Sequence, residues 1–159
     1  MEKLLKLLEE NARYTTEELA VMLGESAESV AKEMDELEQK GIICGYKPLV
    51  NWDKFDDRLV TALIELRVTP EREAGFDDVA ERVMRYPEVE TVYLMSGGFD
   101  LMVIVKGQSF RQVAMFVAKR LATMERVQST GTHFVLHRYK ELGVELDAKT
   151  PDDRGWVSV

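Results

Sequence analysis

The spacing of hydrophobic residues differs between the first forty residues and the rest of the chain. In the first part, apolar residues recur every three or four positions, which is the period of an amphipathic helix. This pattern predicts three helices: one over residues 2–11, one opened by a capping box of Thr15 and Glu18, and one from the N-cap Ser26 to Lys40. We therefore expect the N-terminal part to be a helical cluster.

The junction between the second and third predicted helices has the features of a helix-turn-helix. Gly24 supplies a short turn, and Ala20 is small where the two helices would cross closely. Val30 follows at a position that packs the second helix of the motif. An ordinary three-helix cluster is the alternative explanation of the same spacing.

Residues 42–51 follow the helix stop Gly41 and are predicted to form two short strands about Gly45, in the position of a wing. Cys44 lies in this segment, and we expect it to be a small buried apolar side chain. Residues 1–51 are therefore predicted to be a winged helix-turn-helix domain.

Later in the chain, segments with the alternating pattern of strands are interrupted by two segments with helical spacing. The predicted order is a strand at 59–68, a helix at 76–86, strands at 89–95 and 101–105, a helix capped by Ser109, and a strand at 127–139. This order is the split βαβ, or ferredoxin-like βαββαβ, plan, so the chain is expected to have the α+β class. The expected boundaries are 52–58 for a linker, 59–141 for the domain, and 142–159 for a tail with a short strand at 156–159.

The predicted sheet has more apolar surface than its two helices cover. Leu59 and Leu63 lie on the uncovered side of the first strand, and the middle strands are apolar on both sides. A large uncovered apolar face is unusual in a monomer. The sheet is therefore predicted to pack against a second copy of the chain as a twofold dimer.

The two middle strands are joined by a turn with unusual chemistry. Gly97 and Gly98 are expected to adopt the positive φ of a short hairpin turn. Asp100 is the one charged residue between Tyr93 and Val105. Its carboxylate has two possible uses: hydrogen bonding to the amides of its own turn, or accepting an ammonium or amide group from a ligand.

The composition of the chain indicates which partners and which cellular compartment to expect. The chain has 159 residues and a net charge of −8, so its overall charge does not favour nucleic acid or an anionic membrane. Residues 1–53 contain six bases and twelve acids, a net charge of −6, which repels phosphate on average. One cysteine, the lack of a signal-peptide pattern and the lack of a long apolar run predict a cytoplasmic protein with no membrane contact.

The only histidines, His133 and His137, do not have the spacing of a metal site. Four residues apart on a strand, they share a face but lie roughly 13 Å apart. No other group of metal-ligand residues is present, and no nucleophile elbow, P-loop or dinucleotide fingerprint occurs. We therefore expect no metal, no cofactor and no catalytic residue.

The combination of the two predicted domains resembles the Lrp/AsnC family of feast/famine transcriptional regulators. The residues that carry the resemblance are Leu19-Ala20 through Gly24 and Ser26, Gly41-Ile42-Ile43 with Gly45-Tyr46, the turn from Ser96 to Leu101, and Ser129-Thr130 leading to Phe134-Val135-Leu136. The resemblance implies a homodimer, or an octamer assembled from such dimers, that binds DNA and a small effector, usually an amino acid.

The resemblance also assigns candidate site residues. The candidate effector site is the turn Ser96, Gly97, Gly98 and Asp100, with Thr130 and Thr132 as further candidates. The recognition helix corresponds to residues 26–40, and the candidate DNA contacts are Ser26, Ala27, Ser29, Lys32, Lys40 and Lys47.

Two other functions stay open at this point. Family recognition helices commonly carry two adjacent basic residues where this chain has Lys32 and Glu33, which favours an effector-binding co-regulator with weak or no DNA binding. Siroheme decarboxylases resemble the family in fold, which makes an enzyme acting on a tetrapyrrole the third alternative.

Overall fold

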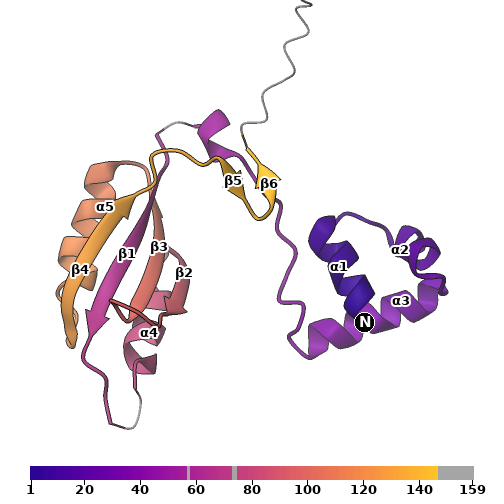
Figure 1. Cartoon of the computed structure of the whole chain (residues 1–159), viewed down its shortest axis with the longest axis horizontal. Helices are drawn as coiled ribbons and strands as arrows, with labels where there is room; N and C mark the ends of the chain where they lie inside the picture. Colours follow the sequence, from indigo (N-terminus) through magenta and orange to yellow (C-terminus); the bar gives the residue numbers. More distant parts are fainter. Residues whose placement is uncertain (57, 73–74, 147–159) are drawn as a thin grey trace, which may run out of the picture. The chain divides into compact units, whose positions relative to one another are not determined.

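The computed structural model describes residues 1–56, 58–72 and 75–146, which fold as two compact units (Figure 1). One unit is Met1–Val50, and the other starts at Asn51.

The N-terminal unit contains the three predicted helices. They are α1 (Glu2–Glu10), α2 (Thr16–Leu23) and α3 (Ala27–Gln39). Their apolar faces meet in one small core whose buried members are Leu4, Leu8, Leu19, Ala20, Val30 and Leu37. These buried residues recur at helical spacing, as predicted. Met22 of α2, which was expected on the same apolar face, is 51% exposed.

Local hydrogen bonds fix the start of α2 and α3. The Thr15 hydroxyl accepts from the Glu18 amide at 3.2 Å, and the Glu18 carboxylate accepts from the Thr15 amide at 2.8 Å. The Ser26 hydroxyl accepts from the Ser29 amide at 3.1 Å. Gly24 has a φ of +72°, so the turn between the helices needs a residue that tolerates the left-handed region.

The predicted wing strands are not formed among residues 42–51. A two-stranded hairpin is at best marginally stable without a surface to pack on, and only Ile43 of residues 42–46 packs against the core. The amides of Ile42 and Ile43 instead bond the Leu37 carbonyl at the end of α3. Cys44, which we expected to be buried, is exposed, and its thiol donates to the Gly41 carbonyl at 3.1 Å.

The C-terminal unit has the predicted βαββαβ order. Its elements are β1 (Val60–Val68), α4 (Asp77–Met84), β2 (Val89–Leu94), β3 (Leu101–Gly107), α5 (Phe110–Phe116) with its continuation η2 (Val117–Leu121), and β4 (Val127–Phe134). The strands form one antiparallel sheet in the order β2-β3-β1-β4.

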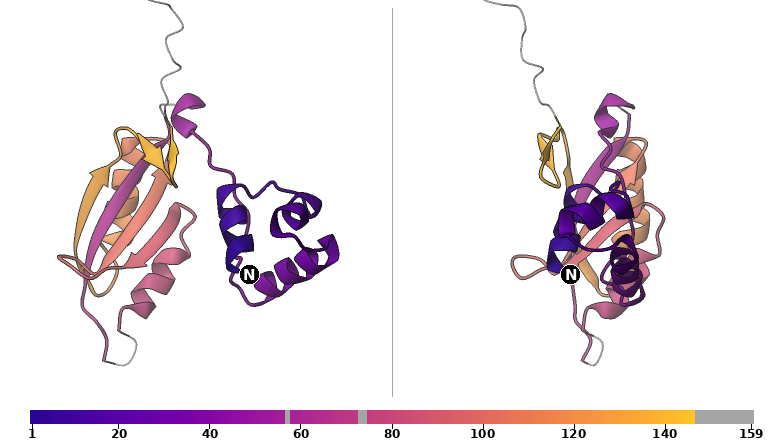
Figure 2. Two further views of the ribbon diagram at one scale, coloured as in Figure 1. Left: turned by 45° about the vertical axis from the view of Figure 1, so that its right-hand side comes forward. Right: turned by 90° about the vertical axis from the view of Figure 1, so that its right-hand side faces the viewer.

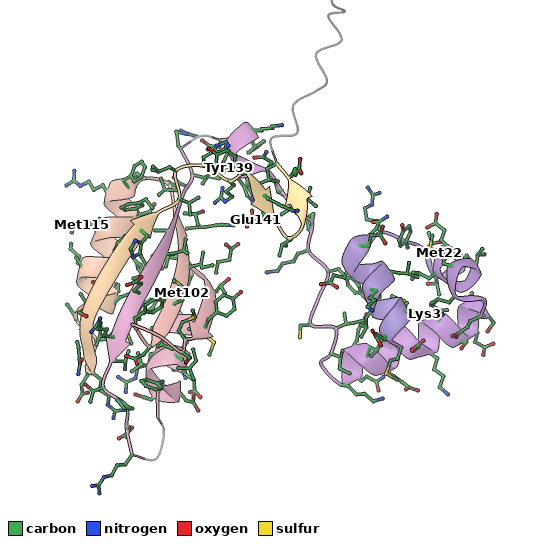
Figure 3. The ribbon with its side chains drawn as sticks, in the orientation of Figure 1. Lys3, Met22, Met102, Met115, Tyr139 and Glu141 are labelled. Carbon is green, nitrogen blue, oxygen red and sulfur yellow. The ribbon has the colours of Figure 1, made fainter. Side chains whose placement is uncertain are left out.

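Both helices cover one face of this sheet, as the two views of Figure 2 show. On that face, alternate residues of β1 and β3 are buried, among them Ala62, Ile64, Leu66, Val103 and Val105. Each of the valine, leucine and isoleucine side chains contributes about 1.5–3 kcal/mol to folding when fully buried. The other face, which we call the open face, carries half-exposed Leu63, Met102 and Ile104. Met102 is labelled in Figure 3.

The last long strand is shorter than predicted. We expected it to run to Tyr139, but β4 ends at Phe134. The ladder ends because its partner β1 begins at Val60: Phe134 pairs with Ala62, and one further bond joins the Val135 amide to the Thr61 carbonyl.

The residues on either side of this domain contain three short elements that the sequence pattern did not reveal. They are η1 (Trp52–Lys54), β5 (Lys140–Glu141) and β6 (Val144–Glu145). The β5–β6 hairpin is followed by Leu146, whose carbonyl accepts from the Asn51 side chain at 3.2 Å. The strand expected at 156–159 lies outside the described residues.

We predict that Gly107→Ala destabilises the protein by about 1–3 kcal/mol, because overpacking a fitted core costs about this much. A Cβ at Gly107 would lie 2.8 Å from Cγ2 of the buried Val113 side chain. The matched control is Gly97→Ala, where a Cβ would meet no atom within 4 Å. Chemical denaturation of both variants measures the difference, and equal stabilities would contradict this packing.

Candidate functional site

The outward side of α3 carries two of the six predicted DNA contacts, Ser29 and Lys32. Glu28, Ser29 and Lys32 are exposed and follow one another at helical spacing. Ser26 is also exposed, but its hydroxyl caps the helix. Ala27 is half-buried and packs against the core, so this side chain faces the helical cluster.

Carboxylates engage two of the predicted contacts. The Ser29 hydroxyl donates to Oε2 of Glu25 at 2.9 Å. This contact was not predicted from the sequence, although the spacing of four residues is that of neighbours on one helix face. Nζ of Lys40 lies 3.5 Å from Oε2 of Glu36. Within the described residues, Lys32 makes no hydrogen bond or ion pair, so its ammonium is available to a phosphate or base.

The segment after α3 is fastened to that helix through Tyr46. Its phenol donates to Oε1 of Glu38 at 2.9 Å. Burial raises the pKa of Tyr46, and the hydrogen bond to Glu38 adds to this shift. The contact keeps the segment that contains exposed Lys47 beside α3 without a strand pairing.

The connection between β2 and β3 is a six-residue loop, residues 95–100, which we call the effector turn. Gly97 and Gly98 do not have the positive φ that we expected of a two-residue hairpin turn. The longer loop removes the need for that conformation, because a two-residue turn is the case that demands it. Ser96, Gly97 and Gly98 are all exposed.

Asp100 ties the effector turn to the end of β1. Its Oδ2 accepts from the Val68 amide at 2.8 Å, and its own amide donates to the Leu66 carbonyl at 2.9 Å. The Asp100 carbonyl accepts from the Met95 amide at 2.8 Å, closing the turn. One carboxylate oxygen therefore has a structural bond, and Oδ1 has no hydrogen bond within the described part of the chain.

The two threonines do not converge with the effector turn in a single chain. Thr130 and Thr132 pair with Leu66 and Ile64 of β1, which place them on the helix-covered face at the edge of the sheet. Thr130 lies at the same end of the sheet as Asp100, but two strand spacings, about 10 Å, separate β3 from β4.

The histidines are engaged elsewhere. Nε2 of His133 lies 3.1 Å from Oε1 of Glu65, on the open face. His137 contacts the Tyr139 ring with centroids 4.5 Å apart. Among the described residues, no three His, Cys, Asp or Glu side chains are grouped so as to hold a metal ion, and no helix is long and apolar enough to cross a membrane.

Comparison with known proteins matches both units to domain families. Residues 2–43 match the winged helix-turn-helix DNA-binding model, and residues 61–144 match the Lrp/AsnC ligand-binding domain. The chain belongs to the Lrp/AsnC family. The resemblance noted in the sequence and the predicted α+β architecture are thereby confirmed.

Relatives extend over nearly the whole chain. The uncharacterized HTH-type transcriptional regulator YugG of Bacillus subtilis is 43% identical over 157 residues, covering 98% of this chain and 95% of YugG. The HTH-type transcriptional regulator LrpA of Pyrococcus abyssi is 29% identical and covers 86% of this chain and 94% of its own length. This Lrp/AsnC chain is therefore a DNA-binding transcriptional regulator.

Two solved structures show how closely the fold is shared. A transcriptional regulator of Neisseria meningitidis in complex with L-methionine has a TM-score of 0.72 at 26% identity, covering 87% of this chain and 89% of its own. Escherichia coli AsnC has a TM-score of 0.68 at 22% identity and covers 87% of this chain and 91% of its own. At this lower identity, the comparison with AsnC shows a shared fold and nothing about function.

We predict that Glu25→Gln strengthens DNA binding about threefold, because a surface charge contributes on the order of 0.5–1 kcal/mol. The substitution removes a negative charge beside Ser29, one of the residues predicted from the sequence to contact DNA. Fluorescence anisotropy with labelled upstream DNA measures the change. Glu10→Gln on α1 is the matched control, and an equal gain in that variant would contradict a local role of Glu25.

Proposed function

We propose that this Lrp/AsnC regulator changes its DNA binding when an amino acid binds at the effector turn, and that it acts as a homodimer or a larger ring of dimers. The observation that carries the proposal is the pair of exposed glycines beside the half-exposed carboxylate of Asp100.

The glycines are not explained by packing within the described chain. Neither has a positive φ, and a Cβ built at either one would meet no atom within 4 Å. Glycine has no side chain to shield its backbone amide, so a ligand or another subunit can approach that amide closely. The carboxylate of an amino acid needs such N–H donors.

Asp100 supplies the complementary group. Oδ2 bonds the Val68 amide, while Oδ1 is not used by the described residues. A free carboxylate oxygen next to bare amides fits the two ends of an amino acid: Oδ1 accepts from the ammonium, and the amides of Gly97 and Gly98 donate to the carboxylate. The L-methionine complex of the Neisseria relative supports this class of ligand.

The effector turn is too open in one chain to enclose a ligand. Ser96, Gly97 and Gly98 are exposed, and the candidate threonines lie across β1. We infer that a second copy completes the site, with Thr130 and Thr132 as its contribution or as part of the surrounding wall.

The open face of the sheet is the proposed dimer contact. Leu63, Met102 and Ile104 form an apolar centre, and the ion pairs of Glu65 with His133 and of Lys106 with Glu90 lie on the same face. An apolar centre surrounded by polar groups is the usual anatomy of an interface between subunits.

The two alternative functions have less support. The hydrogen bond between Ser29 and Glu25 favours a co-regulator that binds DNA poorly, and this outcome is open to test. For the tetrapyrrole enzyme, His133 is engaged with Glu65, so we propose regulation rather than catalysis.

We predict that Asp100→Ala and Asp100→Asn separate the structural role from the ligand role. Alanine at position 100 removes the hydrogen-bond acceptor of the Val68 amide, and Val68 is only 4% exposed. Leaving this buried amide without a partner costs about 1–3 kcal/mol of stability. The Asp100→Asn variant keeps an oxygen that can accept from the Val68 amide, so it should be almost as stable as the parent protein. It lacks the negative charge that would attract the ammonium group of the ligand. Both variants should bind the effector roughly tenfold to a hundredfold more weakly.

Thermal-shift screening of the twenty amino acids, L-methionine first, identifies the ligand, and calorimetric titration then measures its affinity. Full affinity in Asp100→Asn would limit Asp100 to holding the turn on β1.

We predict that Ile104→Lys converts the protein to monomers, because it places a charge in the apolar centre of the open face. Light scattering behind a sizing column measures the mass at micromolar concentration. Met84→Lys, at an exposed position of α4, is the matched control. A monomeric parent protein would contradict the open-face interface.

A further inference from the structure

The helix α5 and its continuation η2 carry an unusual concentration of positive charge for this chain. Residues 101–124 contain four basic residues and no Asp or Glu, in a protein with net charge −8. Three of the four are exposed on α5 and η2: Arg111, Lys119 and Arg120. We call these three residues the α5 cations.

The α5 cations have no carboxylate partner among the described residues. Other cations of the same unit do: Arg82 pairs with Asp78, Lys106 with Glu90, and Arg126 with Glu71. Unpaired cations that share one helix and lack neighbouring acids keep their full attraction for an external anion.

The spacing of Arg111 and Lys119 along the helix fits an extended anion. The exposed side chains between Arg111 and Lys119 carry no charge; they are Gln112, Ala114, Met115 and Ala118. Met115, labelled in Figure 3, is on the outer side of the helix and is 41% exposed. Arg111 and Lys119 are eight residues apart, which is about 12 Å along a helix.

We propose that the α5 cations bind DNA phosphates, as a second contact that is independent of base sequence. This inference rests on the DNA binding of the proposed function. One DNA strand carries a phosphate every ~3.4 Å of helix axis, so a 12 Å span covers about three of them.

The charge of the N-terminal unit explains why such a contact is needed. Residues 1–50 contain six bases and eleven acids, a net charge of −5, and Lys6 and Lys40 pair with Glu2 and Glu36. Neutralisation of phosphates dominates the affinity of proteins for DNA. The α5 cations supply charge that α3 lacks, while base contacts remain with the helix-turn-helix.

The test compares two triple variants that lose the same charge. One is Arg111→Gln/Lys119→Gln/Arg120→Gln, and the control is Lys54→Gln/Arg85→Gln/Lys140→Gln, at exposed positions scattered over the same unit. Anisotropy is measured on a labelled upstream duplex of about six helical turns and on a scrambled one, between about 50 and 200 mM salt.

The α5 triple variant should flatten the plot of log affinity against log salt by about two to three per bound protomer, equally for both duplexes, because each lost phosphate contact removes about 0.9. The control should keep the parent slope. An unchanged slope in the α5 triple variant, or an equal change in the control, overturns the proposal.

Two further outcomes distinguish failure of the phosphate proposal from failure of DNA binding itself. If the parent protein binds neither duplex, DNA binding itself has failed. If the α5 triple variant keeps the parent slope but changes mass in light scattering, the surface is a contact between copies of the chain, and the phosphate proposal is wrong.

Discussion

The pairing of β1 with strands on both of its edges is the constraint on which the C-terminal unit depends. Because β1 lies between β3 and β4, its alternate residues are divided between a face that the helices bury and the open face. The end of the same strand anchors the effector turn, since Leu66 and Val68 bond the backbone and carboxylate of Asp100. The turn proposed to bind the ligand is therefore anchored on one of the two inner strands of the sheet, and that sheet carries the proposed dimer contact.

This arrangement offers a physical route from effector to DNA. A ligand shifts an assembly equilibrium only by its differential affinity for the two states. If the site is completed by a second copy, the ligand binds the assembled form more tightly and stabilises it. Several weak helix-turn-helix units held together gain avidity without any new contact. An acidic N-terminal unit is well suited to such control, because its net negative charge repels phosphate on average.

The sequence predicted most of the fold because its signals were local. The capping box of Thr15 and Glu18, the Ser26 cap and the alternation along β1 each depend on neighbours in sequence, and each is present. The wing strands, the length of β4 and the conformation of Gly97 depended on distant partners or on loop length, which no local pattern records. The same holds for the bond from Asp100 to Val68, 32 residues away in sequence, and the candidate site residues remain predictions for this reason.

The central claim, that an amino acid controls DNA binding through this chain, is tested most directly by the coupling between the two ligands. The affinity for labelled upstream DNA is measured by anisotropy at fixed salt, with each of the twenty amino acids in turn. The account predicts that at least one amino acid changes the DNA affinity about fivefold or more, and that DNA changes the affinity for that amino acid by the same factor. DNA binding that no amino acid alters would contradict it.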